Sequence, residues 1–262
     1  MSIVGVTRIE LATSATPSRR STDDLHPVIL LYFIITTFKP KILQFIIFNQ
    51  DFGFKVILRD LQTRVNVLII PSMAVQSSML PLGTLAPDFN LVDVISNQLI
   101  SLESLRDKKA LLVMFICRHC PYVKHVQEYL SILSKDYQDK DVGIVSISSN
   151  DIAAYPEDAP SSLKEQAQEL GFTFPYLFDE YQEVAKAFTA ACTPDFFLFD
   201  KERKLIYRGQ LDDSRPGNNI PFTGKDLREA IDAVLNDESV NPNQKPSMGC
   251  SIKWKAGNEP LS

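Results

Sequence analysis

Two closely spaced cysteines are the residues of this chain best suited to chemistry. Cys117 and Cys120 follow the apolar run 110–116 and precede a segment whose apolar residues recur at helical spacing. This order places the pair where a strand gives way to a helix N-terminus, and the unpaired N–H groups and dipole there favour a thiolate. A thiolate can attack a disulfide or a peroxide, and a second thiol can then release the product. The spacing therefore indicates a redox-active dithiol.

Two basic residues lie between the cysteines. We expect the charge of Arg118, and any charge on His119, to favour the thiolate of Cys117. The alternative readings are a structural zinc site or two inert core thiols. Zinc usually needs four ligands, and this chain has a single CxxC. Folding would have to bring the missing ligands to the pair, and the candidates are Cys192, Cys250, His119 and His125. We therefore predict neither a metal nor a cofactor.

The elements around the cysteines alternate between strands and helices. Period and composition predict strands at 86–91, 110–116, 142–147, 196–200 and 205–209. They predict helices at 101–105, 161–170, 181–188 and 225–235. A further predicted helix follows the CxxC, with Pro121 in its first turn and apolar residues at helical spacing over 123–137. The last two strands form a predicted hairpin around the charged turn 201–204. The chain is therefore expected to be an α/β protein.

Four short motifs occur in order along the chain. They are Ala86-Pro87-Asp88-Phe89, the CxxC with Pro121-Tyr122, Cys192-Thr193-Pro194-Asp195-Phe196, and Gly249-Cys250-Ser251-Ile252-Lys253-Trp254. Over roughly residues 80–256, this order resembles the thioredoxin superfamily. The branch it resembles is the peroxiredoxin-like one, the alkyl hydroperoxide reductase/thiol-specific antioxidant group, in a subgroup that carries a CxxC. The resemblance implies a thioredoxin-like fold, with a central mixed sheet flanked by helices on both faces.

The resemblance also implies roles for particular residues. Cys117 would be the nucleophile, because it is also expected nearer the exposed helix end, and Cys120 would resolve the intermediate. Pro194 would be the superfamily's cis-proline, which lets the backbone of Thr193 pair with an extended substrate. A trans proline at the start of a strand is the alternative. The implied activity is that of an antioxidant thiol–disulfide oxidoreductase, which acts on protein disulfides or small oxidants and is reduced by a thiol donor.

Two further cysteines are candidate auxiliary thiols. Cys192 either faces the dithiol or is a small buried residue, the commoner fate of a free cysteine. Cys250 follows the last predicted helix by 15 residues, enough chain to reach roughly 50 Å. It could therefore return to the site as a second resolving thiol, or it could be idle in a packing tail.

Several positions depart from the family pattern. Ile116 replaces the tryptophan before the thioredoxin CxxC, and Leu111 replaces a buried carboxylate that serves the resolving thiol, so proton transfer needs another group. Peroxiredoxins carry a threonine three residues before the reactive cysteine. That position is Met114 for Cys117, and Cys117 itself for Cys120. Thiol-dependent peroxidase activity is therefore the second reading, and a metal- or partner-binding thiol module is the third.

A peroxidase also needs an arginine near the reactive sulfur. Arg208 or Arg215 could supply it, although the expected place for either is the surface.

Composition limits the compartment and the partners. Residues 73–262 hold 19 Lys/Arg against 27 Asp/Glu, and this acidic balance argues against nucleic acid as a partner. Four cysteines in 262 residues are too few for a disulfide-rich secreted scaffold. We therefore expect a reducing compartment, the cytoplasm.

The N-terminal part differs from the rest of the chain. Residues 1–72 contain no cysteine and two apolar clusters, 28–38 and 42–48, each too short for the about 20 residues of a membrane span. We predict that this part is an extension, disordered or translated from upstream of a native start at Met73. The domain itself is predicted over 73–240, and the tail that carries Cys250 over 241–262.

Overall fold

The computed structural model describes residues 30–32, 42–49, 53–60, 65–69 and 74–260. The chain divides into two units, Met1–Met73 and Ala74–Ser262. In the first unit, four antiparallel strands form one sheet, in the order β1 (Leu30–Tyr32), β2 (Ile42–Asn49), β3 (Gly53–Asp60) and β4 (Val65–Ile69). The rest of the predicted extension lies outside the described residues. Its upstream origin stays a prediction.

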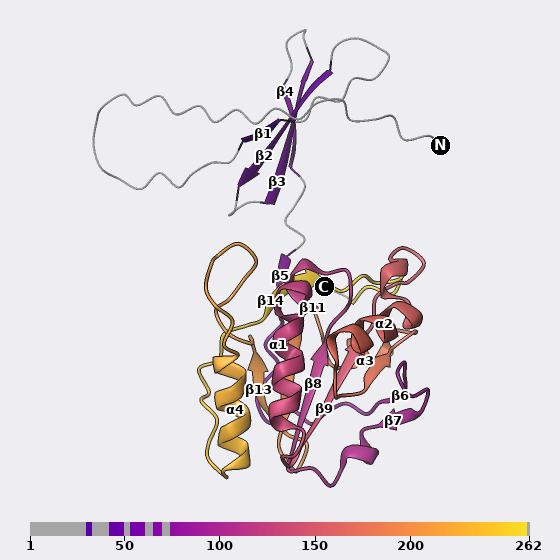
Figure 1. The fold of residues 1–262 in the computed structure, drawn as a ribbon, viewed down its shortest axis with the longest axis vertical. Coiled ribbons are helices and arrows are strands. Elements are labelled where there is room, and N and C mark those ends of the chain that lie inside the picture. The colour runs from indigo at the N-terminus through magenta and orange to yellow at the C-terminus, as the bar shows by residue number, and fades with distance from the viewer. Residues whose placement is uncertain (1–29, 33–41, 50–52, 61–64, 70–73, 261–262) are drawn as a thin grey trace, which may run out of the picture. The chain divides into compact units, whose positions relative to one another are not determined.

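The second unit is built on a sheet of seven strands (Figure 1). Their order across the sheet is β13 (Leu205–Gly209), β12 (Asp195–Phe199), β8 (Ala110–Phe115), β9 (Val142–Ser148), β10 (Tyr176–Phe178), β6 (Asn90–Asp93) and β7 (Leu99–Ser101). Strands β8, β9 and β10 are parallel, and the remaining pairs are antiparallel. The sheet is therefore mixed, as predicted.

The helices agree with the predicted positions, with shifts at some ends. They are α1 (Pro121–Tyr137), α2 (Pro160–Leu170), α3 (Glu183–Ala187) and α4 (Lys225–Leu235), with 3-10 turns η1 (Glu103–Leu105) and η2 (Pro156–Asp158). Helix α4 begins and ends at the predicted residues. Helix α3 is shorter than the predicted 181–188, and the segment 101–105 contains only the turn η1. The entry strand begins at Asn90, later than predicted, because Pro87 has no N–H to donate to a ladder.

The central strand β8 explains why helices cover both faces. All six of its residues are buried, since alternate side chains point to opposite faces of the sheet. Leu112 and Met114 join a core that includes residues of α1, α2 and α4. Leu111, Val113 and Phe115 join a second core that includes Val184 and Ala185 of α3. The predicted sheet with helices on both faces is confirmed.

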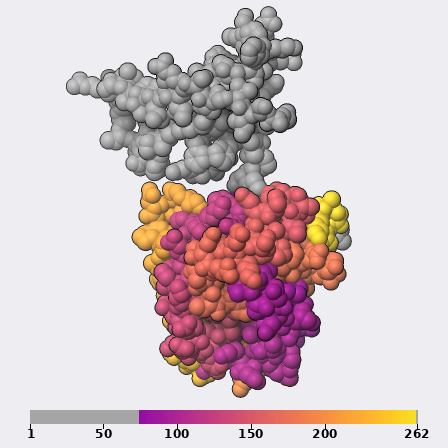
Figure 2. Space-filling view, turned by 45° about the vertical axis from the view of Figure 1, so that its right-hand side comes forward, coloured from indigo at the N-terminus to yellow at the C-terminus, as the bar shows by residue number. Residues whose placement is uncertain are grey.

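A second, small sheet lies at the N-terminal end of α1 (Figure 1). Its middle strand is β14 (Met248–Ser251), which pairs antiparallel with β11 (Cys192–Thr193) and with β5 (Ala74–Gln76). The predicted tail 241–262 therefore contributes a strand to the domain. The described end of the tail, up to Pro260, lies at the surface and is coloured yellow in Figure 2, and Asn258 donates a hydrogen bond to the Tyr181 carbonyl.

Candidate active site

The dithiol lies between β8 and α1. Strand β8 ends at Phe115, and α1 begins at Pro121, whose fixed φ and missing N–H suit the first helical position. The N-cap residue is Cys120, in an extended conformation with φ −65° and ψ 125°. Cys117 lies three residues earlier, in the loop that follows the strand. The expectation that Cys117 is nearer the helix end is therefore wrong, because Pro121 places the helix start beside Cys120.

Both sulfurs contact one residue, Thr193. The hydroxyl Oγ1 of Thr193 is 3.3 Å from the Cys117 sulfur. The carbonyl oxygen of Thr193 accepts a hydrogen bond from the Cys120 thiol at 3.1 Å, and the two sulfurs also hydrogen-bond each other. The Thr193–Pro194 bond is cis, as predicted. Thr193 thus connects the two cysteines to the segment around Pro194.

The two thiols differ in acidity. Burial raises the pKa of Cys117 well above its ordinary value, and Cys120 and Asp158 raise it further. Burial also acts to raise the pKa of Cys120, but hydrogen bonds from Cys117 and Cys250 and the N–H of Val123 in the first turn of α1 outweigh it and lower this pKa. The contact with the Thr193 carbonyl opposes this shift, because only a protonated thiol can make it. The balance favours a thiolate on Cys120 rather than on Cys117.

Arg118 does not approach the dithiol. Its guanidinium donates hydrogen bonds to the Ser162 carbonyl at 2.6 Å and to Glu165 at 2.9 Å, at the start and middle of α2. The tuning of the Cys117 thiolate by Arg118 therefore stays a prediction, with the guanidinium already paired to groups of α2. The carbonyl and carboxylate of α2 are better partners for a guanidinium than a buried thiol.

His119 is held by a buried aspartate that the sequence analysis did not single out. Its Nδ1 is 2.5 Å from Oδ2 of Asp158, and its ring stacks on Tyr155, with centroids 4.9 Å apart. Asp158 is fully buried and lies within the turn η2. Burial acts to raise the pKa of Asp158, but hydrogen bonds from His119 and Asn150 lower it below its ordinary value. Nothing in its sequence context marks this acid, because only folding brings η2 beside Cys117.

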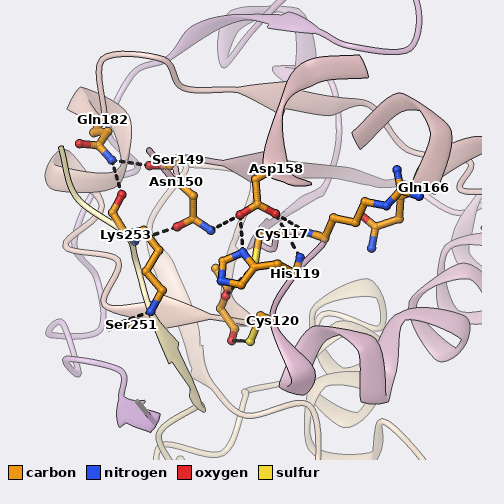
Figure 3. Close-up of polar contacts among 12 residues, drawn as sticks. Cys117, His119, Cys120, Ser149, Asn150, Asp158, Gln166, Gln182, Ser251 and Lys253 are labelled. Carbon is orange, nitrogen blue, oxygen red and sulfur yellow. Dashed lines mark hydrogen bonds and ion pairs between the residues drawn. The ribbon is translucent and has the colours of Figure 1, made fainter. Parts of the chain in front are cut away.

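His119, Asp158 and Cys117 form one cluster. A sulfur, a ring nitrogen and a carboxylate oxygen from the three residues all lie within 4.8 Å of one another, and Figure 3 shows the ring and carboxylate beside the Cys117 sulfur. The ring nitrogen Nε2 is buried and has no hydrogen-bond partner. The His119–Asp158 pair therefore lies beside Cys117 and has a ring nitrogen free of hydrogen bonds, whereas Leu111 provides no carboxylate.

The same cluster could offer three ligand atoms to a metal ion. The two oxygens of Asp158, however, accept hydrogen bonds from the N–H groups of Arg118 and His119, from the Asn150 amide and from the His119 ring. A metal on Asp158 would have to break several of these bonds. The arrangement fits a Cys–His–Asp group, in which His119 and Asp158 are hydrogen-bonded beside Cys117, better than a metal centre.

The two other cysteines lie in the same region but in different surroundings. The Cys192 thiol contacts the carbonyl oxygen of Pro194 at 3.6 Å, and burial raises its pKa. Cys250 lies opposite Thr193 in the pairing of β14 with β11 and hydrogen-bonds Cys120. The structure thus brings Cys250 to the dithiol, and it gives Cys192 the surroundings of a buried core residue.

The prediction that Arg208 lies at the surface is wrong. Its side chain is fully buried, donates hydrogen bonds to Oγ1 of Thr189 at 2.9 Å and to Asp195 at 3.3 Å, and lies over the ring of Phe197. It can be buried because a carboxylate and several oxygens meet its donors. Arg215 lies in the loop between β13 and α4 and donates to the carbonyls of Asp212 and Ser214.

The fold and the dithiol define a thioredoxin-like protein of the peroxiredoxin-like branch. Residues 81–227 match the Redoxin family, and the chain belongs to this family. It is 56% identical to an uncharacterized conserved protein from Geobacillus kaustophilus, with a TM-score of 0.68, over 70% of this chain and 96% of that one. A hypothetical protein from Sinorhizobium meliloti 1021 is 48% identical, with a TM-score of 0.68, over 70% and 99% of the two chains. No curated protein matches.

Family membership identifies the chain as an oxidoreductase with a thiol-based redox function. Among the described residues, no helix is both long and apolar enough to cross a bilayer.

Proposed function

We propose that the protein is a thiol–disulfide oxidoreductase in which Cys120 is the nucleophile and Cys117 the resolving thiol. The observation that carries the proposal is the position of Cys120 at the N-cap of α1, with a lowered pKa and with the Cys117 sulfur in contact. This reverses the order of the two thiols expected from the sequence. A thiolate at a helix N-terminus is the usual attacking group in such exchange reactions.

The reaction has two steps. The Cys120 thiolate attacks one sulfur of a disulfide, the second sulfur leaves as a thiolate, and a mixed disulfide with Cys120 remains. Cys117 then loses its proton and attacks the Cys120 sulfur, which forms the Cys117–Cys120 disulfide and releases the other half of the substrate as a thiolate. An external thiol donor returns the protein to the dithiol. Two electrons pass from the two cysteines to the substrate.

The second step needs a base, because burial raises the pKa of Cys117. The His119 ring lies in one cluster with the Cys117 sulfur, and its Nε2 has no hydrogen-bond partner. In our proposal this ring takes up the proton, and Asp158 stabilises the imidazolium through Nδ1. We assign the His119–Asp158 pair to this proton transfer. It takes the place of the buried carboxylate that the family pattern puts at position 111.

Burial of the site supports small substrates. Both Cys117 and Cys120 have 0% exposure, so a reagent must enter a closed site and a large protein surface cannot reach the sulfurs directly. A small disulfide or another small oxidant fits this site best. Removal of such oxidants is the basis for the proposed antioxidant role.

The test is the reduction of glutathione disulfide by the full-length dithiol protein. We expect Cys120→Ser to reduce the rate at least about 100-fold, because no thiolate remains at the helix end. A double variant, Cys117→Ser with Cys250→Ser, should stop at a mixed disulfide with glutathione, seen as an added mass on Cys120. The matched control Cys192→Ser, also fully buried, should retain the parent rate. A Cys120→Ser protein with the parent rate contradicts the proposal.

Peroxidase activity is the second candidate, because Thr193 supplies a hydroxyl to the site. Its Oγ1 lies 3.3 Å from Cys117, although the threonine expected three residues before the reactive cysteine is missing. The Cys120 thiolate would attack hydrogen peroxide to give a sulfenic acid and hydroxide, and Cys117 would displace water to form the disulfide. Peroxide consumption that is lost in both Cys120→Ser and Thr193→Val supports this activity. Consumption that Cys120→Ser leaves unchanged excludes it.

A further inference from the structure

Strand β14 occupies the edge at which an extended substrate was expected to pair. That edge is the backbone of Thr193, and in the structure Cys250 lies directly opposite it in antiparallel register. The next pair in the same register is Cys192 with Ser251. A cysteine of the chain's own C-terminal segment therefore occupies the position that a substrate cysteine would take.

The approach of the two backbones is unusually close at Gly249. A Cβ at this position would lie 2.0 Å from the Thr193 carbonyl oxygen. Only glycine permits this contact, because any side chain would overlap backbone atoms that cannot move aside. The close approach carries the neighbouring Cys250 toward the dithiol.

Hydrogen bonds hold the segment on both sides of Cys250. On one side, Ser77 and Ser247 exchange two bonds of 2.9 Å, from the Ser77 N–H to the Ser247 carbonyl and from the Ser247 N–H to the Ser77 hydroxyl. On the other side, the Lys253 N–H donates to the Asn150 amide oxygen at 2.8 Å. Asn150 is also bonded to Asp158 of the Cys–His–Asp group (Figure 3). The segment is thus tied to the site through several independent contacts.

The sulfur of Cys250 hydrogen-bonds the sulfur of Cys120. Cys120 therefore has two thiol partners, Cys117 from the preceding loop and Cys250 from β14. Cys250 is 5% exposed, so it is sealed in the same closed site as the dithiol. The Cys120 thiol also donates to the carbonyl of Thr193 at 3.1 Å, and Thr193 is the register partner of Cys250.

We propose that Cys250 is a third redox-active thiol and that β14 acts as a built-in substrate strand, which exchanges a disulfide with Cys120. This inference rests on the proposed role of Cys120 as the nucleophile. It also deepens the proposed function, because a bound β14 excludes an extended protein strand from Thr193. The external substrate of the closed form is therefore a small disulfide.

The exchange is balanced in atoms and electrons. After Cys120 has formed a mixed disulfide with a small thiol, Cys250 gives up its proton and attacks the Cys120 sulfur. The Cys120–Cys250 bond forms, and the small thiol leaves with that proton. Attack by Cys117 on the same sulfur then converts this disulfide into Cys117–Cys120 and returns Cys250 to a thiol, with no net transfer of electrons.

The chain offers a direct assay, since trypsin separates all four cysteines. Cys117 falls in peptide 110–118, Cys120 in 119–124, Cys192 in 187–201 and Cys250 in 229–253. The reduced full-length protein is mixed with glutathione disulfide, quenched at intervals with acid and N-ethylmaleimide, digested, and analysed for linked peptides by mass spectrometry. The parent, Cys117→Ser, Cys250→Ser and Cys192→Ser proteins are compared.

We expect a linked 119–124/229–253 pair in the parent at early times and as the main product in Cys117→Ser. The pair should be lost in Cys250→Ser and unchanged in Cys192→Ser. A parent protein that forms the Cys117–Cys120 link, and never the Cys120–Cys250 link, overturns this inference and leaves the proposed function intact. Absence of every link to peptide 119–124 in the parent instead overturns the proposed function itself.

Discussion

The sulfur of Cys120 lies 3.1 Å from the carbonyl oxygen of Thr193, the residue whose backbone also faces Cys250. The same residue brings its hydroxyl within 3.3 Å of Cys117. One threonine before the cis-proline is therefore in contact with, or directly opposite, each of the three thiols to which we assign redox roles. This common neighbour explains why Cys250, far along the chain from Cys117 and Cys120, can act with them as one site.

The first prediction concerns the Asp158 carboxylate. Asp158→Asn removes the charge that stabilises a protonated His119, so the resolving step should slow by about 100-fold while the attack by Cys120 keeps its rate. Single-turnover kinetics with glutathione disulfide separates the two phases. The neighbouring exposed acid gives a matched control, Glu157→Gln, which should change neither phase. Equal slowing of both phases would indicate a merely structural role for Asp158.

The second prediction concerns pH. Because the pKa of Cys120 is lowered, its thiolate should persist as pH falls, and its alkylation rate should stay level from pH 8 to pH 6. An ordinary thiol, of pKa about 8.5, should lose about tenfold in rate per pH unit over this range.

A variant at position 250 checks the cause of this behaviour. Cys250→Ala removes one hydrogen bond to the Cys120 thiolate, so its pKa should rise and the fall in alkylation rate should move to higher pH. Cys192→Ala is the control and should keep the parent profile, because the Cys192 thiol bonds the Pro194 carbonyl instead. A parent profile that falls tenfold per unit contradicts the assignment of a thiolate to Cys120.

The third prediction concerns Gly249. Gly249→Ala places a Cβ against the Thr193 carbonyl, so β14 must move away from β11. Amide hydrogen exchange in residues 248–251 should then accelerate, and the Cys120–Cys250 link should decrease. Gly143→Ala is a control for the loss of a glycine, because its φ is not positive and a Cβ there meets only side-chain atoms, at 3.4 Å or more. Unchanged exchange in Gly249→Ala would show that β14 is not held by this contact.

The fourth prediction concerns the buried Arg208–Asp195 pair. Arg208→Met leaves the buried Asp195 without its charge partner and should lower the free energy of unfolding by about 3–5 kcal/mol. The control is Arg106→Met, which breaks an exposed ion pair with Glu103 and should cost about 0–1 kcal/mol. Urea unfolding followed by circular dichroism measures both changes.

The cost of Arg208→Met should depend on pH. Burial raises the pKa of Asp195 to about 6, although Arg208 opposes the shift, and the unfolded value is about 3.9. A raised carboxyl pKa favours folding at low pH, and this contribution is lost as pH rises through the folded pKa. Without Arg208 this pKa rises further, so the variant should lose less stability at pH 5 than at pH 8. A pH-independent loss would contradict a charged Asp195 in the parent.

Local patterns in the sequence predicted most of the fold. Residues close together in the chain carry these signals. The spacing of apolar residues and the type of turn between segments predicted the ends of α4, the hairpin β12–β13 and the buried strand β8. Pro121 was expected in the first turn of α1, and the structure confirms this. The consequence that Cys120 rather than Cys117 is the cap residue was not drawn from the sequence, and our proposed order of the two thiols depends on it.

The remaining features depend on contacts between distant segments. Asp158 meets His119 across 39 residues, and Cys250 meets Thr193 only through the pairing of β14 with β11. Arg208 can be buried because folding brings Asp195 and Thr189 to its donors. These contacts join residues that are distant in the sequence, so the local periodicity or spacing of residues does not predict them. The structure was needed to find the proton-transfer pair and the third thiol.

The most direct test of the account is to find which thiol reacts first. The reduced protein is treated at pH 7 with less than one equivalent of iodoacetamide, and the label is located by tryptic digestion and mass spectrometry. The account predicts the label on peptide 119–124, which contains Cys120, with little on 110–118 or 229–253. A label mainly on 110–118, or spread evenly over the four cysteine peptides, would contradict it.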